Sequence, residues 1–247
     1  MERAKGIEPS SSAWKADALP LSYARETAHS LSECRDAVKS PRVNLLVSSG
    51  GQICYATRMD NPKPFLKYLK ILGSWRDVAD AARTTIRMPE GQKEPSSRWK
   101  KRILLAEHSP VRKLLVSWKW SNLPYWVSVH FVRHKYGIEH FVSTQRTDRT
   151  GEDRTEKRQD APVEHECFAN AAEVMFISRR RLCAQASPET RAAWKLVVDE
   201  LAKVEPELAA CCVPDCVYRG FCPEFKSCGY ANTPAYAEAV KRYRTVE

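Results

Sequence analysis

Cationic and hydroxyl side chains gather between Arg133 and Arg149, and side chains of these types can bind phosphate. Arg133-His134-Lys135 is followed, after the seven residues YGIEHFV, by Ser143. A guanidinium presents a planar fork of N–H groups that fits a phosphate, and imidazole or hydroxyl groups add further donors. Apolar residues interrupt the charge, so three interpretations are open: a solvated basic face, a nucleic-acid patch, or a site for a small polyanion.

Cysteines form a second group that could do chemistry, and five of them crowd the C-terminal quarter of the chain: Cys211, Cys212, Cys216, Cys222 and Cys228. Zinc sites usually use cysteines two to four residues apart, a spacing that only Cys212 and Cys216 have. We therefore expect reduced cysteines that pack in the core and no metal. A structural zinc or iron–sulfur site is the alternative.

The overall composition limits the location and the partners. A formal net charge of +10 indicates an anionic partner without identifying it. No apolar run approaches the ~20 residues that a membrane helix needs, and residues 1–30 lack the pattern of a signal peptide. We expect a cytoplasmic protein with no membrane partner and with reduced thiols.

The first 40 residues are expected to lie outside the fold. Residues 1–30 have neither helical nor strand periodicity, which is typical of a disordered leader. The alternative is a mis-annotated upstream extension, because GIEP at positions 6–9 can be encoded by the reverse complement of a sequence like the T-arm of a transfer-RNA gene. Both interpretations remove this segment from the prediction of the fold.

Hydrophobic periodicity predicts the elements that must position these groups, and the outline is α+β with helices dominating. Strands are predicted at 43–49 and 114–120, and a polar loop at 88–101. Residues 136–151 are predicted to be a loop or a short helix. The predicted helices are residues 61–84 (one or two helices), 124–135, 162–183, a helix that starts at Ser187-Pro188-Glu189, and 235–244.

The motif at Arg133 resembles the signature of the flavin-dependent thymidylate synthases (ThyX), which is Arg-His-Arg, seven residues, then Ser. The third basic residue is Lys135 in this chain. Upstream, Ser109-Pro110 is similar to a Thr-Pro of the family. Downstream, Asn170-Ala171, Arg181 and Glu189 match the spacing of a family segment. STQRTDR, ISRRRLC and CVYRGFCPE resemble phage-type members, and the resemblance covers residues 43–230.

The resemblance implies a ThyX-like fold with a central antiparallel sheet and a helix-rich C-terminal half. A catalytic domain is expected at 41–232 and a C-terminal helix at 233–247. The implied reaction converts dUMP to dTMP, with methylenetetrahydrofolate as the one-carbon donor and NADPH-reduced FAD as the hydride source. The implied assembly is a homotetramer with active sites between subunits, in the host cytoplasm if a phage encodes the chain.

The resemblance also implies roles for single residues. The expected FAD-binding residues are Arg133, His134, Lys135, Asn170 and Ser109. Ser143 would lie at the phosphate of dUMP and Arg181 at its uracil ring, so that these two carry the catalytic site. Arg146 and Gln145 would complete the substrate site.

Four positions depart from the family pattern. His140 replaces an Asn, Phe141 replaces a Glu, and the arginine expected two residues after Ser143 is displaced to Arg146. Ala172 stands where the family has an FAD-contacting arginine. In the family, the first three of these four positions are those expected to read the pyrimidine. A flavin- and folate-dependent hydroxymethylase acting on dUMP or dCMP is therefore the alternative activity.

A nucleic-acid binder is the competing class of protein. Single-strand binders place aromatic side chains beside a basic groove, and Trp118, Trp120, Tyr125 and Trp126 precede Arg133. These aromatic residues fall on faces predicted to be buried, and the basic residues are dispersed. We therefore expect no specific nucleic-acid partner.

Overall fold

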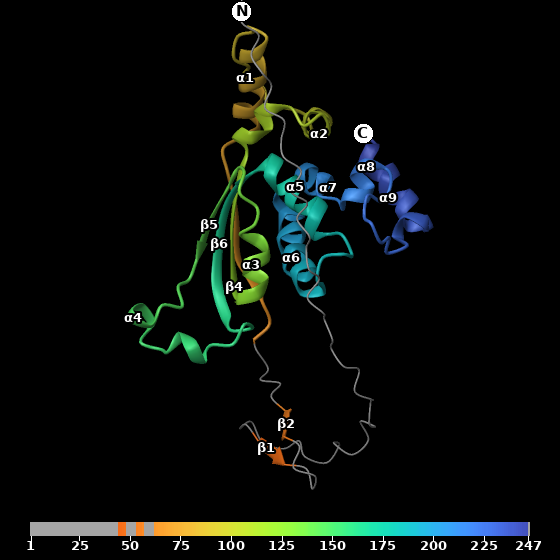
Figure 1. Cartoon of the computed structure of the whole chain (residues 1–247). Coiled ribbons are helices and arrows are strands. Elements are labelled where there is room, and N and C mark those ends of the chain that lie inside the picture. The colour runs from red at the N-terminus through yellow and green to blue at the C-terminus, as the bar shows by residue number, and fades with distance from the viewer. Residues whose placement is uncertain (1–43, 48–52, 57–61, 247) are drawn as a thin grey trace, which may run out of the picture. The chain divides into compact units, whose positions relative to one another are not determined.

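The computed structural model describes residues 44–47, 53–56 and 62–246 (Figure 1). The segment 1–40, expected to be a leader or an extension, lies outside these residues. Contacts divide the chain after Thr57. In the first unit, β1 (Asn44–Val47) pairs antiparallel with β2 (Ile53–Ala56), which confirms the predicted strand near residue 43.

The second unit is built on a four-stranded antiparallel sheet with the order β3-β4-β6-β5. Helices α3, α5 and α6 lie on one side of it (Figure 1). The predicted α+β class with a central antiparallel sheet is therefore confirmed. The strands are β3 (Phe65–Leu72), β4 (Leu115–Pro124), β5 (Ile138–Val142) and β6 (Pro162–Asn170).

Helices fill most of the rest of the second unit. Three are 3-10 helices: η1 (Ser109–Lys113), η2 (Arg154–Glu156) and η3 (Tyr230–Asn232). The α-helices are α1 (Trp75–Thr85), α2 (Ser97–Leu105), α3 (Tyr125–Phe131), α4 (Thr147–Thr150), α5 (Ala171–Arg181), α6 (Pro188–Val204), α7 (Pro206–Cys211), α8 (Asp215–Arg219) and α9 (Pro234–Arg244). None of the helices in the described part of the chain combines the length and the apolar character of a membrane span.

The core lies between the sheet and its helices. Alternate residues of β4 point inward, and Trp118 and Trp120 are fully buried. The ring of Trp118 meets Trp120 and Trp194 edge-on, at centroid distances of 5.7 Å and 5.6 Å. Trp118 and Trp120, which could have contacted bases in a nucleic-acid binder, are therefore part of the core.

The helix predicted over residues 61–84 is wrong in its first half, which forms β3. This segment pairs with β4 along its whole length, so hydrogen bonds to a distant strand override its local pattern. Gly73 then adopts a left-handed conformation, and Ser74 starts α1 through a capping box with Asp77. Only α1 corresponds to the prediction.

The helix predicted over residues 162–183 is wrong in the same way, because residues 162–170 form β6. This strand bonds to β4 on one side and to β5 on the other. Val163, His165, Cys167 and Ala169 are buried while the residues between them are more exposed. Such alternation is typical of a strand with one buried face. The helix begins only at Ala171, where Asn170 caps it.

The remaining predictions differ in detail. Helix α3 ends at Phe131 rather than at Lys135, and residues 121–122 belong to β4 instead of capping the helix. The loop predicted to 101 ends at Ser96, which caps α2. Residues 138–142 form strand β5 rather than a loop or helix. The predicted strand at 114–120, the helix start at Ser187 and the final helix are confirmed. The ring of Tyr243 from that final helix is buried.

Candidate functional site

The basic motif lies in the turn between α3 and β5, and this turn points its histidine inward. The N–H of His134 donates to the carbonyl of Phe131 over 2.9 Å, which closes one further turn after the helix. The side chain of His134 is buried, whereas Arg133 and Lys135 are exposed. The turn thus holds an imidazole inside the protein with a cationic side chain on either side of it.

The imidazole of His134 connects a carboxylate to a guanidinium. Its Nδ1 lies 3.3 Å from Oε1 of the buried Glu173, and Nε of Arg181 lies 3.0 Å from its Nε2. A guanidinium N–H can only donate, so Nε2 must be the acceptor and the ring proton must reside on Nδ1. Nδ1–H then donates to Glu173. The three side chains form one chain of hydrogen bonds, and the arginine determines its donor-to-acceptor direction, from Arg181 through His134 to Glu173.

Arg181 is held in place from two directions. Besides its bond to His134, its Nη2 donates to the carbonyl of His130 over 2.6 Å. Burial lowers the pKa of Arg181, and the nearby charges of Arg133 and Arg180 lower it further. An arginine stays protonated despite such shifts. The turn and the end of α5 therefore hold a positive charge that is partly removed from water and suited to an anionic or polar ligand.

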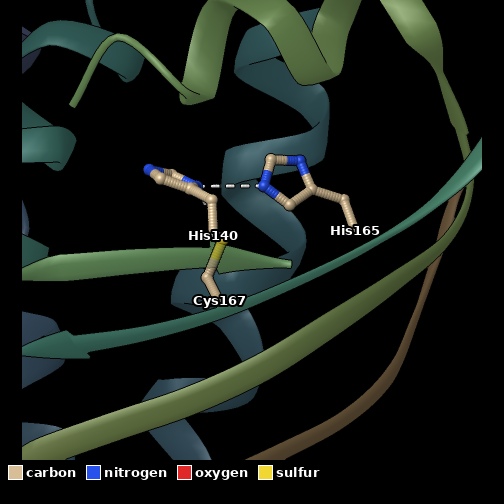
Figure 2. Close-up of side chains that lie close together, drawn as sticks. All are labelled: His140, His165 and Cys167. Atoms are coloured by element: carbon tan, nitrogen blue, oxygen red, sulfur yellow. Dashed lines mark hydrogen bonds between the residues drawn. The ribbon is translucent and has the colours of Figure 1, made fainter. Parts of the chain in front are cut away.

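A second chain of hydrogen bonds starts from the carbonyl of His134 and runs into the core. His140 Nε2 donates to that carbonyl over 2.9 Å, so its Nδ1 is the acceptor. His165 Nε2 lies 3.0 Å from His140 Nδ1 and therefore carries the proton. The dashed line in Figure 2 marks this hydrogen bond. The hydroxyl of Ser128 then donates to His165 Nδ1 over 3.0 Å. One backbone carbonyl thus fixes the tautomers of two rings.

Burial keeps both of these rings neutral. It lowers the pKa of His140, and it lowers the pKa of His165 to about 3, with a smaller effect from His140 itself. Cys167 approaches the same place, with its Sγ 3.3 Å from His140 Nδ1, and burial raises the pKa of its thiol well above the usual range. The cluster His140, His165 and Cys167 is therefore uncharged at neutral pH.

Asn170 joins the motif turn to α5. Its N–H donates to the carbonyl of Gly137 over 2.9 Å, and its Oδ1 accepts from the N–H of Glu173 over 3.0 Å. Gly137 has a φ of +74°, and a Cβ there would lie 2.2 Å from Nδ2 of Asn170. The side chain of Asn170 and the motif turn thus touch so closely that only glycine fits between them.

The other predicted residues lie in different surroundings. Ser143 extends the ladder beyond β5, and its hydroxyl accepts from the N–H of Glu164 over 3.0 Å. The guanidinium of Arg146 binds Asp148 through Nε (2.9 Å) and Nη2 (2.7 Å). Gln145 is half-buried.

Ser109 is exposed at the start of η1, which packs against α5. The contacts of the structure bring His134, Arg181 and Asn170 together. They do not bring Ser143, Arg146 or Ser109 to them.

Sequence reasoning missed Glu173, His165, Cys167 and Ser128. A signal existed for Glu173, because an Asn followed three residues later by Glu is the spacing of a helix start. His165 and Cys167 stand in the alternating run VEHEC, which would have placed both on one face of a strand. For Ser128 we find no signal, since its contact with His165 spans 37 residues.

Comparison with known proteins gives a likeness of fold only. No protein-family model matches the chain, and no curated protein matches it. Similar solved structures include a Thymidylate Synthase X (ThyX) from Helicobacter pylori with FAD and dUMP, which is 13% identical with a TM-score of 0.47. The match covers 61% of this chain and 98% of that one. A flavin-dependent thymidylate synthase ThyX from Helicobacter pylori complexed with FAD and dUMP is 11% identical, with a TM-score of 0.49 and coverages of 61% and 99%.

Proposed function

We propose that the chain is a flavin-dependent thymidylate synthase that converts dUMP to dTMP. In this proposal methylenetetrahydrofolate provides the one-carbon unit and NADPH reduces FAD. The active sites would form between the subunits of a homotetramer. Light scattering can measure the mass of this assembly. The observation that carries the proposal is the contact between His134 and Arg181, two residues 47 positions apart that were selected separately by their motifs.

The residues present suit FAD and a nucleotide monophosphate. Arg133 and Lys135 are exposed on either side of the buried His134, so their charges are available to a phosphate or pyrophosphate. When bound, FAD supplies the hydride chemistry, and the protein supplies binding and orientation. The side chain of Asn170 lies against the same turn. Its hydrogen bond to the N–H of Glu173 fixes its orientation at the proposed FAD site.

We assign different roles to the two best-placed residues. The imidazole of His134 uses one nitrogen for Glu173 and the other for Arg181. In place of the FAD contact that the resemblance implies, we therefore propose that His134 is a positioning residue that aims the guanidinium. Arg181 uses two of its N–H groups for His134 and His130, and its remaining donors would meet the pyrimidine ring. Ser143 and Arg146 would reach the phosphate only after leaving Glu164 and Asp148.

Hydroxymethylation of dUMP or dCMP is the second candidate, and the surroundings of two substituted residues favour it. Phe141 is 61% exposed and lies one position from His140 on the edge strand, so it offers no polar group where the family pattern has a carboxylate. Both ring nitrogens of His140 are occupied within the protein. The pyrimidine would therefore be read by a different set of groups.

Anaerobic incubation with reduced FAD, methylenetetrahydrofolate and either dUMP or dCMP separates these activities. Mass spectrometry should show a methyl group added to dUMP. A hydroxymethyl group on either nucleotide would select the second candidate. A protein that binds no flavin and modifies neither nucleotide would exclude both.

Arg181→Ala tests the proposed nucleotide contact, and Arg180→Ala is its matched control because Arg180 is the exposed neighbour. We expect Arg181→Ala to lose dUMP binding in calorimetry and to retain flavin, whereas Arg180→Ala retains both. Normal dUMP affinity in Arg181→Ala would contradict this assignment.

A further inference from the structure

Two adjacent strands bring three metal-binding side chains together beneath α3. His140 of β5 is the register partner of Cys167 on β6, and His165 lies two residues away on the same face of β6. Their ligand atoms all lie within 4.8 Å of one another (Figure 2). No other group of three such atoms is as close in the described part of the chain. The sheet therefore holds two imidazole nitrogens and a sulfur at one point.

The distances within this cluster are close to those of a metal centre. His140 Nδ1 lies 3.0 Å from His165 Nε2 and 3.3 Å from Cys167 Sγ. Around a tetrahedral zinc ion, bond lengths of about 2.0 to 2.3 Å separate two nitrogens by about 3.3 Å and a nitrogen from a sulfur by about 3.6 Å. These two pairs would each have to open by roughly 0.3 Å. The third pair, His165 Nε2 and Cys167 Sγ, lies within 4.8 Å and would have to settle at about 3.6 Å.

The outer nitrogens of both rings are already held in the way that metal-binding histidines are held. His140 Nε2 donates to the carbonyl of His134, and His165 Nδ1 bonds to the hydroxyl of Ser128. Metal-ligating imidazoles use such bonds to fix the ring and to direct the other nitrogen at the ion. His140 already presents the lone pair of Nδ1, so its tautomer needs no change.

We propose that His140, His165 and Cys167 bind a divalent ion of the zinc class through Nδ1, Nε2 and Sγ. Two imidazoles and a thiolate select such an ion over magnesium or calcium. The proton of the Cys167 thiol is released as the sulfur–metal bond forms. The proton of His165 moves from Nε2 to Nδ1 and is donated to Ser128, and no group is oxidised or reduced. A water molecule would occupy the remaining position, as in zinc sites with three protein ligands.

The proposal is independent of the flavin activity, and cobalt substitution tests it on the full-length, reduced protein. The chelator-treated protein is titrated with Co²⁺, which gives a sulfur-to-cobalt charge-transfer band and tetrahedral ligand-field bands when a thiolate binds it. We expect one equivalent to bind with the release of one proton, and Zn²⁺ to displace it. A wild-type protein without these bands would overturn the proposal.

Variants locate the ion. Cys167→Ala should lose the charge-transfer band, and His140→Gln should weaken binding at least tenfold. Cys183→Ala is the matched control, because Cys183 lines a separate cavity with Cys216, Cys222 and Cys228. A band that persists in Cys167→Ala, or that disappears in Cys183→Ala, would place the ion at those cysteines and contradict the proposal.

Far-UV circular dichroism verifies folding of each variant. If Cys167→Ala does not fold, His140→Gln decides, because His140 is only half-buried on an edge strand.

Discussion

Replacing Gly137 by alanine tests whether the motif turn and the cap of α5 form one unit. The substitution adds a Cβ at a φ of +74°, 2.2 Å from Nδ2 of Asn170. A left-handed conformation costs a non-glycine residue about 1 kcal/mol. Moving Asn170 aside also removes the cap that its Oδ1 provides to α5, a loss of about 1 kcal/mol. We therefore expect Gly137→Ala to lower the free energy of unfolding by about 2 kcal/mol.

The control for this substitution is Gly151→Ala, which adds the same methyl group at nearly the same φ. Gly151 has a φ of +73°, and a Cβ there meets nothing within 4 Å. Only the backbone strain remains, so the loss should be about 1 kcal/mol or less. The two variants differ in the contact with Asn170, and their difference isolates it.

Urea denaturation followed by tryptophan fluorescence measures both losses, with an unchanged slope as the sign of an unchanged unfolding reaction. A double-mutant cycle identifies the cause. In an Asn170→Ala background the cap is absent and the clash is relieved, so Gly137→Ala should then cost only about 1 kcal/mol. An equal cost in both backgrounds, or equal losses for Gly137→Ala and Gly151→Ala, would refute the coupling.

Three further predictions concern the scaffold. Ser178→Ala should destabilise the protein by about 1 to 3 kcal/mol, because it leaves the buried indole N–H of Trp194 without its acceptor at 2.9 Å; urea denaturation measures this, and a neutral result would contradict it. A hydrogen bond from the N–H of Gly91 holds the pKa of Asp80 below its usual 3.8, so the carboxylate stabilises the protein above that pH. The advantage of the wild type over Asp80→Asn in thermal unfolding should therefore disappear as the pH falls below about 3.8, and an advantage independent of pH would exclude this cause. Cys228 is exposed and should be alkylated in the native protein, whereas the buried cysteines stay unmodified until denaturant is added; mass spectrometry of the peptides shows which react.

Sequence patterns predicted the elements whose signals are local. The alternation in β4 and the Ser187-Pro188 start of α6 depend on neighbouring residues, and both are confirmed. Strands β3 and β6 form hydrogen bonds with strands far along the chain. Both segments were wrongly predicted to be helices because each was judged only from its own residues. The physical reason is that the backbone hydrogen bonds of a strand are made with another strand and not within the segment itself.

The residues of the candidate site also fall into those that the sequence could indicate and those that only the fold reveals. The resemblance to the family motifs selected His134 and Arg181, and the structure then shows their contact. Spacing could have placed Glu173 at a helix start and His165 on one face of a strand, but it could not have identified their partners His134 and His140, because those contacts depend on which side chains fold next to them. The burial that sets the low pKa of His165 is likewise created only by the fold.

The double attachment of His134 has a consequence for how variants of this protein should be interpreted. Its ring aims Arg181 while its carbonyl orients His140, so substitution of its side chain would leave the guanidinium with only its bond to the carbonyl of His130. In the positioning role proposed for His134, no group that touches a ligand would be removed. A loss of affinity in a His134 variant would then measure lost preorganisation, which appears as an entropic penalty in calorimetry. Arg133 and Lys135 are exposed, and their substitution would report direct contact through a change in the salt dependence of binding.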